Sequence, residues 1–250
     1  GRDEQDLDDG FDIDEAGTGG IDVRVTRSQA INNFDEGFDF DEEDEGGISM
    51  NFSRVQAVGN SDEGIKAGEE DEGGLWAKLD RVELIGNGDD DKAVEASGGE
   101  GIQLSEEDEG NSYVRLNQVA ASGNGSQGIK IEEEDEGRLT TFLNRVDAWA
   151  NGNTGVVIEE SGDGGLYAFI DRLESNKNDG DGLELAESGA GIVLGHLTKS
   201  KFQDNSGYGV VAKQEDEGLG LLRLRKVDVD GNDEGPADVQ GIFLIGDLDD

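Results

Sequence analysis

The chain contains no cysteine, a single histidine (His196) and little positive charge. Without cysteine it can form neither disulfides nor thiolate metal sites, and one histidine excludes a multi-histidine zinc site. No apolar run reaches the roughly 18 residues that a membrane-spanning helix needs. Asp and Glu outnumber Lys and Arg by 61 to 20, which gives a net charge of −41. This acidity disfavours nucleic acid and anionic membranes as partners and favours cations, basic proteins or saline surroundings.

Hydrophobic residues are also scarce, at 33% of the chain, and such a composition with unbalanced charge is typical of disorder. An internal repeat argues against disorder, because a solenoid needs only a thin core shared by neighbouring coils. The repeat recurs at a spacing of 27 except for steps of 37 and 32, which we attribute to insertions of ten residues after Asn87 and five after Asn232. The repeat predicts eight 27-residue coils and a partial ninth. Its pattern, Gly-apolar-x-apolar, begins at Gly10, Gly37, Gly64, Gly101, Gly128, Gly155, Gly182, Gly209 and Gly241.

Two further columns recur in every full coil. A second glycine lies nine residues after the first, and short blocks around it alternate apolar with polar residues, which is typical of β-strands. Gly and Asn tolerate the left-handed backbone of sharp corners. We therefore expect three short strands per coil, each paired in parallel with its counterpart in the next coil. The second column is an asparagine near the end of each coil, at Asn33, Asn60, Asn87, Asn124, Asn151, Asn178, Asn205 and Asn232.

The asparagine column can form a hydrogen-bonded ladder, because a side-chain amide carries both a donor and an acceptor. Such a ladder at a tight turn between two sheets resembles the pectin-lyase-like superfamily, and the resemblance covers Gly10 to Asp250. It implies an all-β, right-handed parallel β-helix, with residues 10–250 as one domain after an acidic segment at residues 1–9. It implies no particular activity, because lyases, hydrolases, epimerases, adhesins and phage fibres share this fold. An oligomer or a longer parent protein is a further hypothesis, because solenoids need caps over their open ends.

An acidic turn follows the first strand of most coils. The motif E-E-D-E-G ends at Gly46, Gly73, Gly110 and Gly137, a Q-E-D-E-G variant ends at Gly218, and coils six and seven carry fewer acids. Carboxylates stacked about 4.8 Å apart repel one another. Calcium would offset the repulsion, because carboxylate oxygens are hard ligands; the alternative is a solvated acidic face screened by salt in a saline habitat. The candidate calcium ligands are Glu42, Asp44, Glu69, Asp71, Glu106, Asp108, Glu133 and Asp135.

A basic column occurs once in each coil, at a fixed interval after the first glycine. We expect these cations either to balance local acids such as Asp80 and Asp171 or to form a rail for an anionic ligand, such as a uronate polymer or an acidic strip of another protein. The column comprises Arg27, Arg54, Arg81, Gln118, Arg145, Arg172, Lys199 and Lys226.

Outward positions of the strand after the acidic turn carry aromatic and basic residues. An exposed aromatic patch of this size usually marks a binding site or a partner surface, and aromatics flanked by cations suit sugar rings that carry acid groups. Oligomerisation or packing against another segment is the alternative. The candidate partner-binding residues are Trp76, Lys78, Tyr113, Arg115, Phe142, Tyr167, Phe169 and His196.

Catalysis has little support in the sequence. The columns provide many carboxylates but no singular constellation, no G-x-S-x-G motif occurs, and Ser/His chemistry would depend on His196 alone. We expect a non-catalytic, secreted or cell-surface binding or structural module, stabilised by calcium or high salt, with a carbohydrate or protein partner and no organic cofactor. The alternative is a polysaccharide-active lyase, hydrolase or epimerase that uses the same aromatic face, because the resemblance implies that this sheet lines the substrate cleft.

Overall fold

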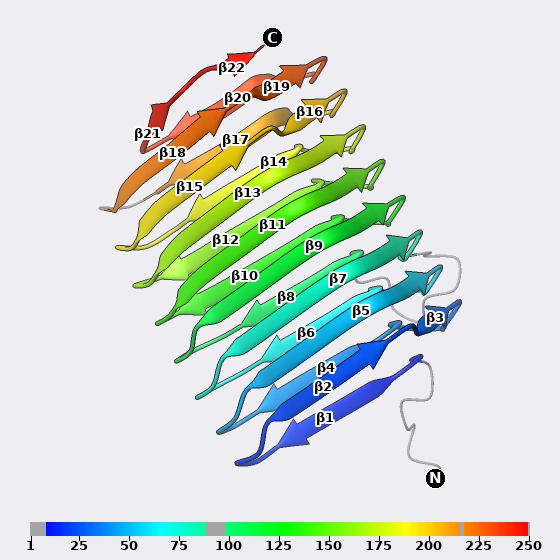
Figure 1. The fold of residues 1–250 in the computed structure, drawn as a ribbon. Coiled ribbons are helices and arrows are strands. Elements are labelled where there is room, and N and C mark those ends of the chain that lie inside the picture. The colour runs from blue at the N-terminus through cyan, green and yellow to red at the C-terminus, as the bar shows by residue number, and fades with distance from the viewer. Residues whose placement is uncertain (1–8, 89–98, 216–217, 250) are drawn as a thin grey trace.

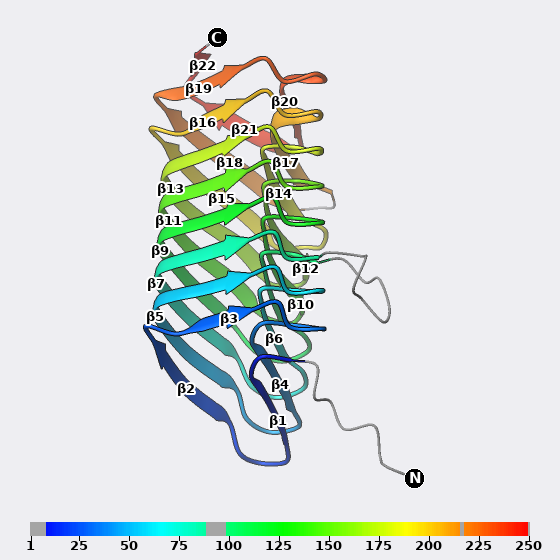
Figure 2. The ribbon, with the colours of Figure 1, turned by 90° about the vertical axis from the view of Figure 1, so that its right-hand side faces the viewer.

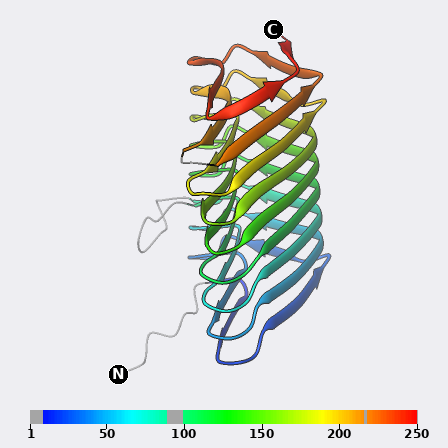
Figure 3. The ribbon, with the colours of Figure 1, turned by 90° about the vertical axis from the view of Figure 1, so that its left-hand side faces the viewer.

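The chain forms a stack of parallel β-coils in a computed structural model that describes residues 9–88, 99–215 and 218–249 (Figure 1). Two sheets run the length of the stack, and Figures 2 and 3 show from either side that the coils lie one above another. Of the predicted acidic segment at residues 1–9, only Asp9 lies within the described residues. In this part of the chain no helix is long and apolar enough to cross a membrane.

The first sheet has nine parallel strands and contains the strand that precedes each acidic turn. In spatial order they are β1 (Asp12–Ala16), β4 (Asp39–Glu43), β6 (Ile65–Glu69), β8 (Ile102–Glu106), β10 (Ile129–Asp135), β12 (Val156–Gly162), β14 (Leu183–Glu187), β17 (Tyr208–Gln214) and β20 (Gly235–Gln240).

The second sheet has thirteen strands and contains the predicted aromatic face. Its main path is β2 (Ile21–Thr26), β5 (Ile48–Val58), β7 (Leu75–Ile85), β9 (Ser112–Ser122), β11 (Arg138–Trp149), β13 (Gly165–Asn176), β15 (Ile192–Thr198), β18 (Leu219–Arg225) and β21 (Ile242–Ile245). The short strands beside that path are β3 (Gln29–Ile31), β16 (Lys201–Gln203), β19 (Val227–Asp230) and β22 (Leu248–Asp249).

Strand register confirms the repeat. Phe142 on β11 pairs with Phe169 on β13, exactly one repeat later in the chain. Trp76 on β7 pairs with Tyr113 on β9, a step that is longer by ten residues, so the extra residues lie between these strands. The predicted insertion after Asn87 falls largely on residues 89–98, which lie outside the described residues.

The second and third predicted strands of each coil are continuous in β5, β7, β9, β11 and β13. Each of these strands bends at the basic column, whose eight residues all have φ between 54° and 61°. A single left-handed residue turns the chain without ending the strand pairing on either side. This corner therefore uses Arg, Lys and Gln in the left-handed conformation that Gly and Asn adopt more readily.

Alternation of side chains produces a thin apolar core. On β7, Leu75, Ala77 and Leu79 point inward and are almost fully buried, whereas Trp76 and Lys78 point outward. The same alternation in each coil stacks Leu, Ile, Val and Phe into one continuous core along the axis. At the N-terminal end Phe11 remains 43% exposed.

The asparagine ladder is present in full. Each Nδ2 donates to the Oδ1 of the next Asn over 2.7–3.0 Å, from Asn33 to Asn232. Each Asn from Asn33 to Asn205 also donates its backbone N–H to that same Oδ1 over 3.0–3.2 Å. Each amide inside the ladder thus serves as donor and acceptor, and the ladder satisfies its own turn.

The ninth coil begins earlier than we predicted. Val210 on β17 pairs with Ala237 on β20 at the usual spacing of the repeat, whereas the step from Leu221 on β18 to its partner Phe243 on β21 is shorter by five residues. The predicted five-residue insertion after Asn232 is therefore wrong. Instead, the turn between β20 and β21 is shortened, with Gly241 at φ 67°. The sequence pattern misled because Gly-apolar-x-apolar fits the starts of strands in both sheets.

Candidate functional site

An aromatic stripe crosses five neighbouring coils on the outer face of the second sheet. Ring centroids lie 6.4 Å apart for Trp76–Tyr113, 5.5 Å for Tyr113–Phe142, 5.0 Å for Phe142–Phe169 and 5.6 Å for Phe169–His196. The first and third of these pairs are stacked. Parallel register produces most of the stripe, because Trp76 pairs with Tyr113 and Phe142 pairs with Phe169 at strand spacing. Between Tyr113 and Phe142 the stripe moves to the neighbouring outward column, since Phe142 pairs with Arg115. We call these five residues the aromatic stripe.

The structure places all eight predicted partner-binding residues on this outer face. Tyr113, Arg115, Phe142, Phe169 and His196 line one open groove of about 740 Å³. The other three predicted residues lie beside it: Trp76 extends the stripe at 42% exposure, Lys78 is its neighbour on β7, and Tyr167 packs under Arg138 with the guanidinium carbon 5.1 Å from the ring centroid.

A chain of polar side chains that we did not predict borders the same groove. Asn117 donates to Asp80 over 2.5 Å, and Asn144 donates to Asn117 over 2.9 Å. Arg172 then donates to the Asn144 Oδ1 over 3.3 Å. The sequence does place Asp80, Asn117 and Asn144 in one column, each directly before a residue of the basic corner. Their mutual hydrogen bonds depend on side-chain orientations, which the column alone does not predict.

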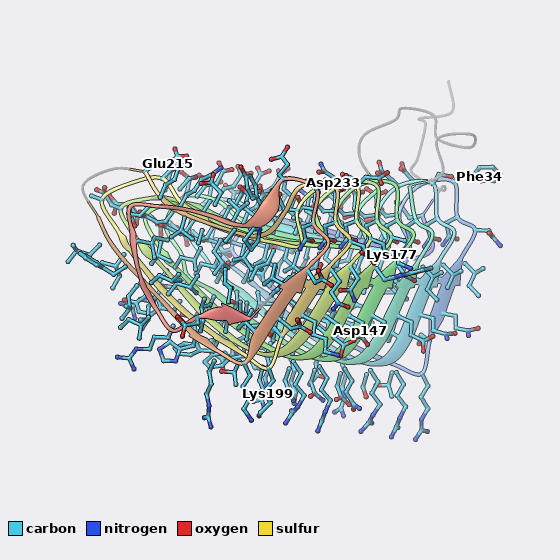
Figure 4. All side chains as sticks on the ribbon, turned by 90° about the horizontal axis from the view of Figure 1, so that it is seen from above. Phe34, Asp147, Lys177, Lys199, Glu215 and Asp233 are labelled. Atoms are coloured by element: carbon cyan, nitrogen blue, oxygen red, sulfur yellow. The ribbon has the colours of Figure 1, made fainter. Side chains whose placement is uncertain are left out.

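The basic column projects from one corner of the coil. Seen along the axis, a row of long side chains that includes Lys199 extends from this corner (Figure 4). Some of these cations balance local acids, as we expected: Arg81 lies 3.2 Å from Asp80, and Lys199 lies 3.3 Å from Asp171. Arg172 also pairs with Asp171, over 2.6 Å, so the rail is partly neutralised where it borders the groove.

The acidic turns are divided between the interior and the surface. Asp44, Asp71, Asp108 and Asp135 are exposed and have φ of 75–80°. The first Glu of each turn points inward instead and is at most 1% exposed. A uniformly solvated acidic face is therefore wrong for these residues. We call the inward set the glutamate row, and it comprises Glu42, Glu69, Glu106, Glu133, Glu160 and Glu187.

The glutamate row has few hydrogen-bond donors. In its first four members no N–H or hydroxyl group donates to either carboxylate oxygen, and the side-chain partners are neighbouring carboxyl groups. Glu160 and Glu187 each accept one backbone N–H, from Gly164 at 3.1 Å and from Gly191 at 3.0 Å. Loss of hydration by burial is the main cause that raises the pKa of Glu106, to about 9, and neighbouring carboxylates raise it further. Burial likewise raises the pKa of Glu69, Glu133 and Glu160 to about 7.

Other carboxylates gather at the corner beside the asparagine ladder. Among the described residues, groups of three with oxygens within 4.8 Å of one another are Asp9–Asp35–Glu36, Asp9–Asp12–Asp39 and Glu36–Asp62–Glu63. None contains a predicted calcium ligand, and calcium at the acidic turns stays a prediction. Burial, followed by neighbouring acids, raises the pKa of Glu36 to about 10 and that of Glu63 to about 9. Lys66 pairs with Asp39 over 3.3 Å and with Asp41 over 2.9 Å at the edge of this cluster.

Comparisons with known proteins found two distant structural matches. No known protein family and no curated protein matches the sequence. Two solved structures are similar: the A-module of mannuronan C-5 epimerase AlgE4 from Azotobacter vinelandii, at 11% identity over 95% of this chain and 88% of that one, with a TM-score of 0.19, and the AlgE6 A-module from the same organism, at 10% identity over 94% and 91%, with a TM-score of 0.18. At these TM-scores the two matches carry no argument about fold or function. The strand register and the asparagine ladder by themselves show a parallel β-helix.

Proposed function

We propose that this chain is a non-catalytic binding module, secreted or displayed at a cell surface, whose aromatic stripe takes an acidic carbohydrate chain. The observation that supports this most is the unbroken stripe over five coils beside the open groove. A monomeric surface rarely keeps so many rings in contact without a partner.

The chemistry of the groove suits a polyuronate. Sugar rings present apolar C–H faces, which pack on aromatic faces. Arg115 and Arg172 lie in the same groove and offer planar donors that match a carboxylate. A polymer lying along the solenoid axis would meet one ring per coil, about every 4.8 Å. Elsewhere the acidic surface repels polyanions, which restricts them to this face.

The acidic exterior fits a saline environment. A net charge of −41 produces self-repulsion that dissolved salt weakens. We include salt stabilisation in the proposal. Within the part of the chain that the structure describes, the exposed Asp44, Asp71, Asp108 and Asp135 make no ion pair of the kind that the basic corner makes with Asp80 and Asp171.

A polysaccharide-active enzyme is the second candidate. It is favoured by one observation: His196, Asp171 and Arg172 line the same groove as the aromatic stripe. One observation argues against an enzyme. Asp171 forms ion pairs with Arg172 and Lys199, and this pairing makes its carboxylate a poor general acid or base.

Binding of a defined polyuronate tests the proposal. Titration calorimetry with oligogalacturonate or oligomannuronate should give saturable binding, and a neutral oligoglucan should not bind. Phe142→Ala should weaken binding by about tenfold, because it removes the ring at the centre of the stripe. The matched control is Trp149→Ala, which removes a ring that is 51% exposed outside the stripe and should leave affinity unchanged.

Two results would contradict the module. One is the absence of acidic-sugar binding at millimolar ligand. The other is turnover of the polymer, as new reducing ends, unsaturated uronate or changed epimer content, that His196→Ala abolishes; this would establish the enzyme instead.

A further inference from the structure

The glutamate row poses an electrostatic problem inside the fold. Carboxyl groups from consecutive coils lie in one corner. In Glu42, Glu69, Glu106 and Glu133 every oxygen is buried without an N–H or hydroxyl donor, and their side-chain partners are neighbouring carboxyl groups. A bare buried carboxylate is very costly unless positive charge or donors surround it. Positive charge, as bound protons or as a metal cation, must therefore accompany the row.

The corner that holds the glutamate row could be filled by amide side chains instead of carboxylates. The asparagine ladder shows that stacked amides close their own hydrogen bonds, and the chain does place an amide at the end of this row. Gln214 occupies the equivalent position on β17, where its Nε2 donates to the Gly189 carbonyl over 3.2 Å. Because an amide fits this corner, the retention of acids in the other coils indicates that their charge has a use.

Further oxygens converge on the row. A β-carbon added to Gly137 would collide with Glu133 Oε1 and with the backbone carbonyl oxygen of Gly110. The two oxygens therefore lie close together over a residue that has no side chain. The same arrangement recurs one coil below, where Glu106 Oε1 and the Gly73 carbonyl meet over Gly110. Two acceptors held this close are the arrangement that a cation stabilises.

A hydroxyl group provides independent support at the same level. Ser112 is 2% exposed, and its Oγ has no hydrogen-bond partner. It is the next inward residue after Gly110, the glycine that packs against the Glu106 carboxyl. Inward residues meet across this turn, since a β-carbon on Gly195 would contact Leu185 of the same coil. Leu185 and Gly195 lie five residues to either side of the centre of their turn. Glu106 and Ser112 lie three residues to either side of the centre of theirs, both at inward positions, and we infer from this symmetry that Ser112 faces Glu106.

We propose that calcium binds inside this corner, between carboxylates of consecutive coils, and that Glu106, Glu133 and Ser112 form the site with the most ligands. One divalent ion neutralises two carboxylates. Two oxygens from each carboxylate, the Gly110 carbonyl and the Ser112 hydroxyl supply six oxygens, which matches the six to eight that calcium takes. The exposed Asp108 and Asp135 stay outside this donor set. The site is independent of whatever binds the aromatic stripe.

Thermal unfolding of the full chain in calcium, magnesium and sodium chloride at equal ionic strength tests the proposal. Calcium should raise the melting temperature saturably and more than the other two salts do. Glu106→Gln should still fold, because Gln214 shows that an amide fits the corner, and should weaken calcium affinity by about tenfold or more. Ser112→Ala should weaken it by a smaller factor. Glu107→Gln is the matched control: it removes the same charge one residue away, on the exposed side, and should leave calcium affinity unchanged.

Three outcomes would overturn the proposal. The first is an equal effect of the three salts at matched ionic strength, which means screening alone. The second is a calcium effect that Glu106→Gln leaves intact. The third is a calcium effect that Asp108→Asn abolishes and Glu106→Gln does not, which would move the ion to the exposed side of the turn.

Discussion

Two axial rows at different corners of the same coil solve one stacking problem differently. The asparagine ladder stacks groups that are both donor and acceptor, so each amide satisfies the next. The glutamate row stacks groups that, when ionised, only accept, and four of its members receive no N–H or hydroxyl donor. Identical spacing therefore produces a closed network in one corner and an excess of acceptors in the other. A repeated column contributes to stability only when its chemistry is complementary to itself.

The glutamate row itself contains a smaller contrast. In the E-E-D-E-G coils the row carboxylates have no donor, whereas in the less acidic coils Glu160 and Glu187 receive a backbone N–H from Gly164 and Gly191. The turns with most surface acid thus provide least support to the buried acid, and it is there that we place the cation.

Breaking the asparagine ladder should have the largest effect. Asn124→Ala removes the acceptor of the Asn87 backbone and side-chain N–H groups and the donor to Asn151. Buried groups left unpaired cost about 3 kcal/mol in total, which lowers the melting temperature by about 6–12 °C. Scanning calorimetry measures this. Asn153→Ala, an exposed position in the corresponding turn of the next coil, should change the melting temperature by about 1 °C or less; equal losses in the two variants would show that the ladder is not what the turn depends on.

Replacing a glutamate of the row by an amide should raise the melting temperature, whereas breaking the asparagine ladder lowers it. In chelator, Glu133→Gln replaces an unpaired buried acid by an amide and should raise the melting temperature by about 3–8 °C. In millimolar calcium the gain should shrink, because the variant binds the ion less well. The control is Glu134→Gln, an exposed neighbour that should give a small, calcium-independent shift. A Glu133→Gln variant less stable than the parent chain in chelator would contradict the view that the buried charge is unpaired there.

The buried carboxylates beside the asparagine ladder should make the stability of the fold depend on pH. Burial raises the pKa of Glu63 from an ordinary value of 4.5 to about 9. Since the folded state binds the proton more tightly than the unfolded state, this contribution to stability is fully present below about pH 4.5 and is lost as pH rises toward 9. Acidification from pH 8.5 to 5.5 should therefore raise the melting temperature by about 3–6 °C.

The contribution of Glu63 is separable from general charge repulsion. Glu63→Gln should flatten the pH dependence of the melting temperature, whereas Glu72→Gln, at an exposed position, should keep the slope of the parent chain. If both variants retain the slope, the whole-molecule charge and not the buried cluster sets the pH dependence.

The repeat predicted the coils, the asparagine ladder and the outward aromatic face, because identical residues at a fixed period occupy identical environments. The glutamate row also had a signal that we misjudged. Glu133 follows Ile129 and Ile131 in the alternation of β10, at an inward position. Glu is rarely buried without a partner. We therefore predicted an exposed side chain from the residue type, although the alternation indicated an inward one.

Other features depended on three-dimensional detail that alternation does not encode. The Asp80–Asn117–Asn144 chain follows from side-chain orientations at matched register. The shortened turn at Gly241 was hidden because the repeat pattern fits either sheet. The continuous aromatic stripe also shifts by one outward position between Tyr113 and Phe142, a diagonal contact that depends on ring orientation.

The most direct test of an ion inside the acidic corner is a crystal structure grown in calcium, with anomalous differences recorded at a wavelength where calcium scatters anomalously. We expect a peak inside the corner, within bonding distance of the Glu106 and Glu133 carboxylates and the Ser112 hydroxyl. A peak on the exposed side at Asp108 or Asp135, or no peak at either place at saturating calcium, would contradict it.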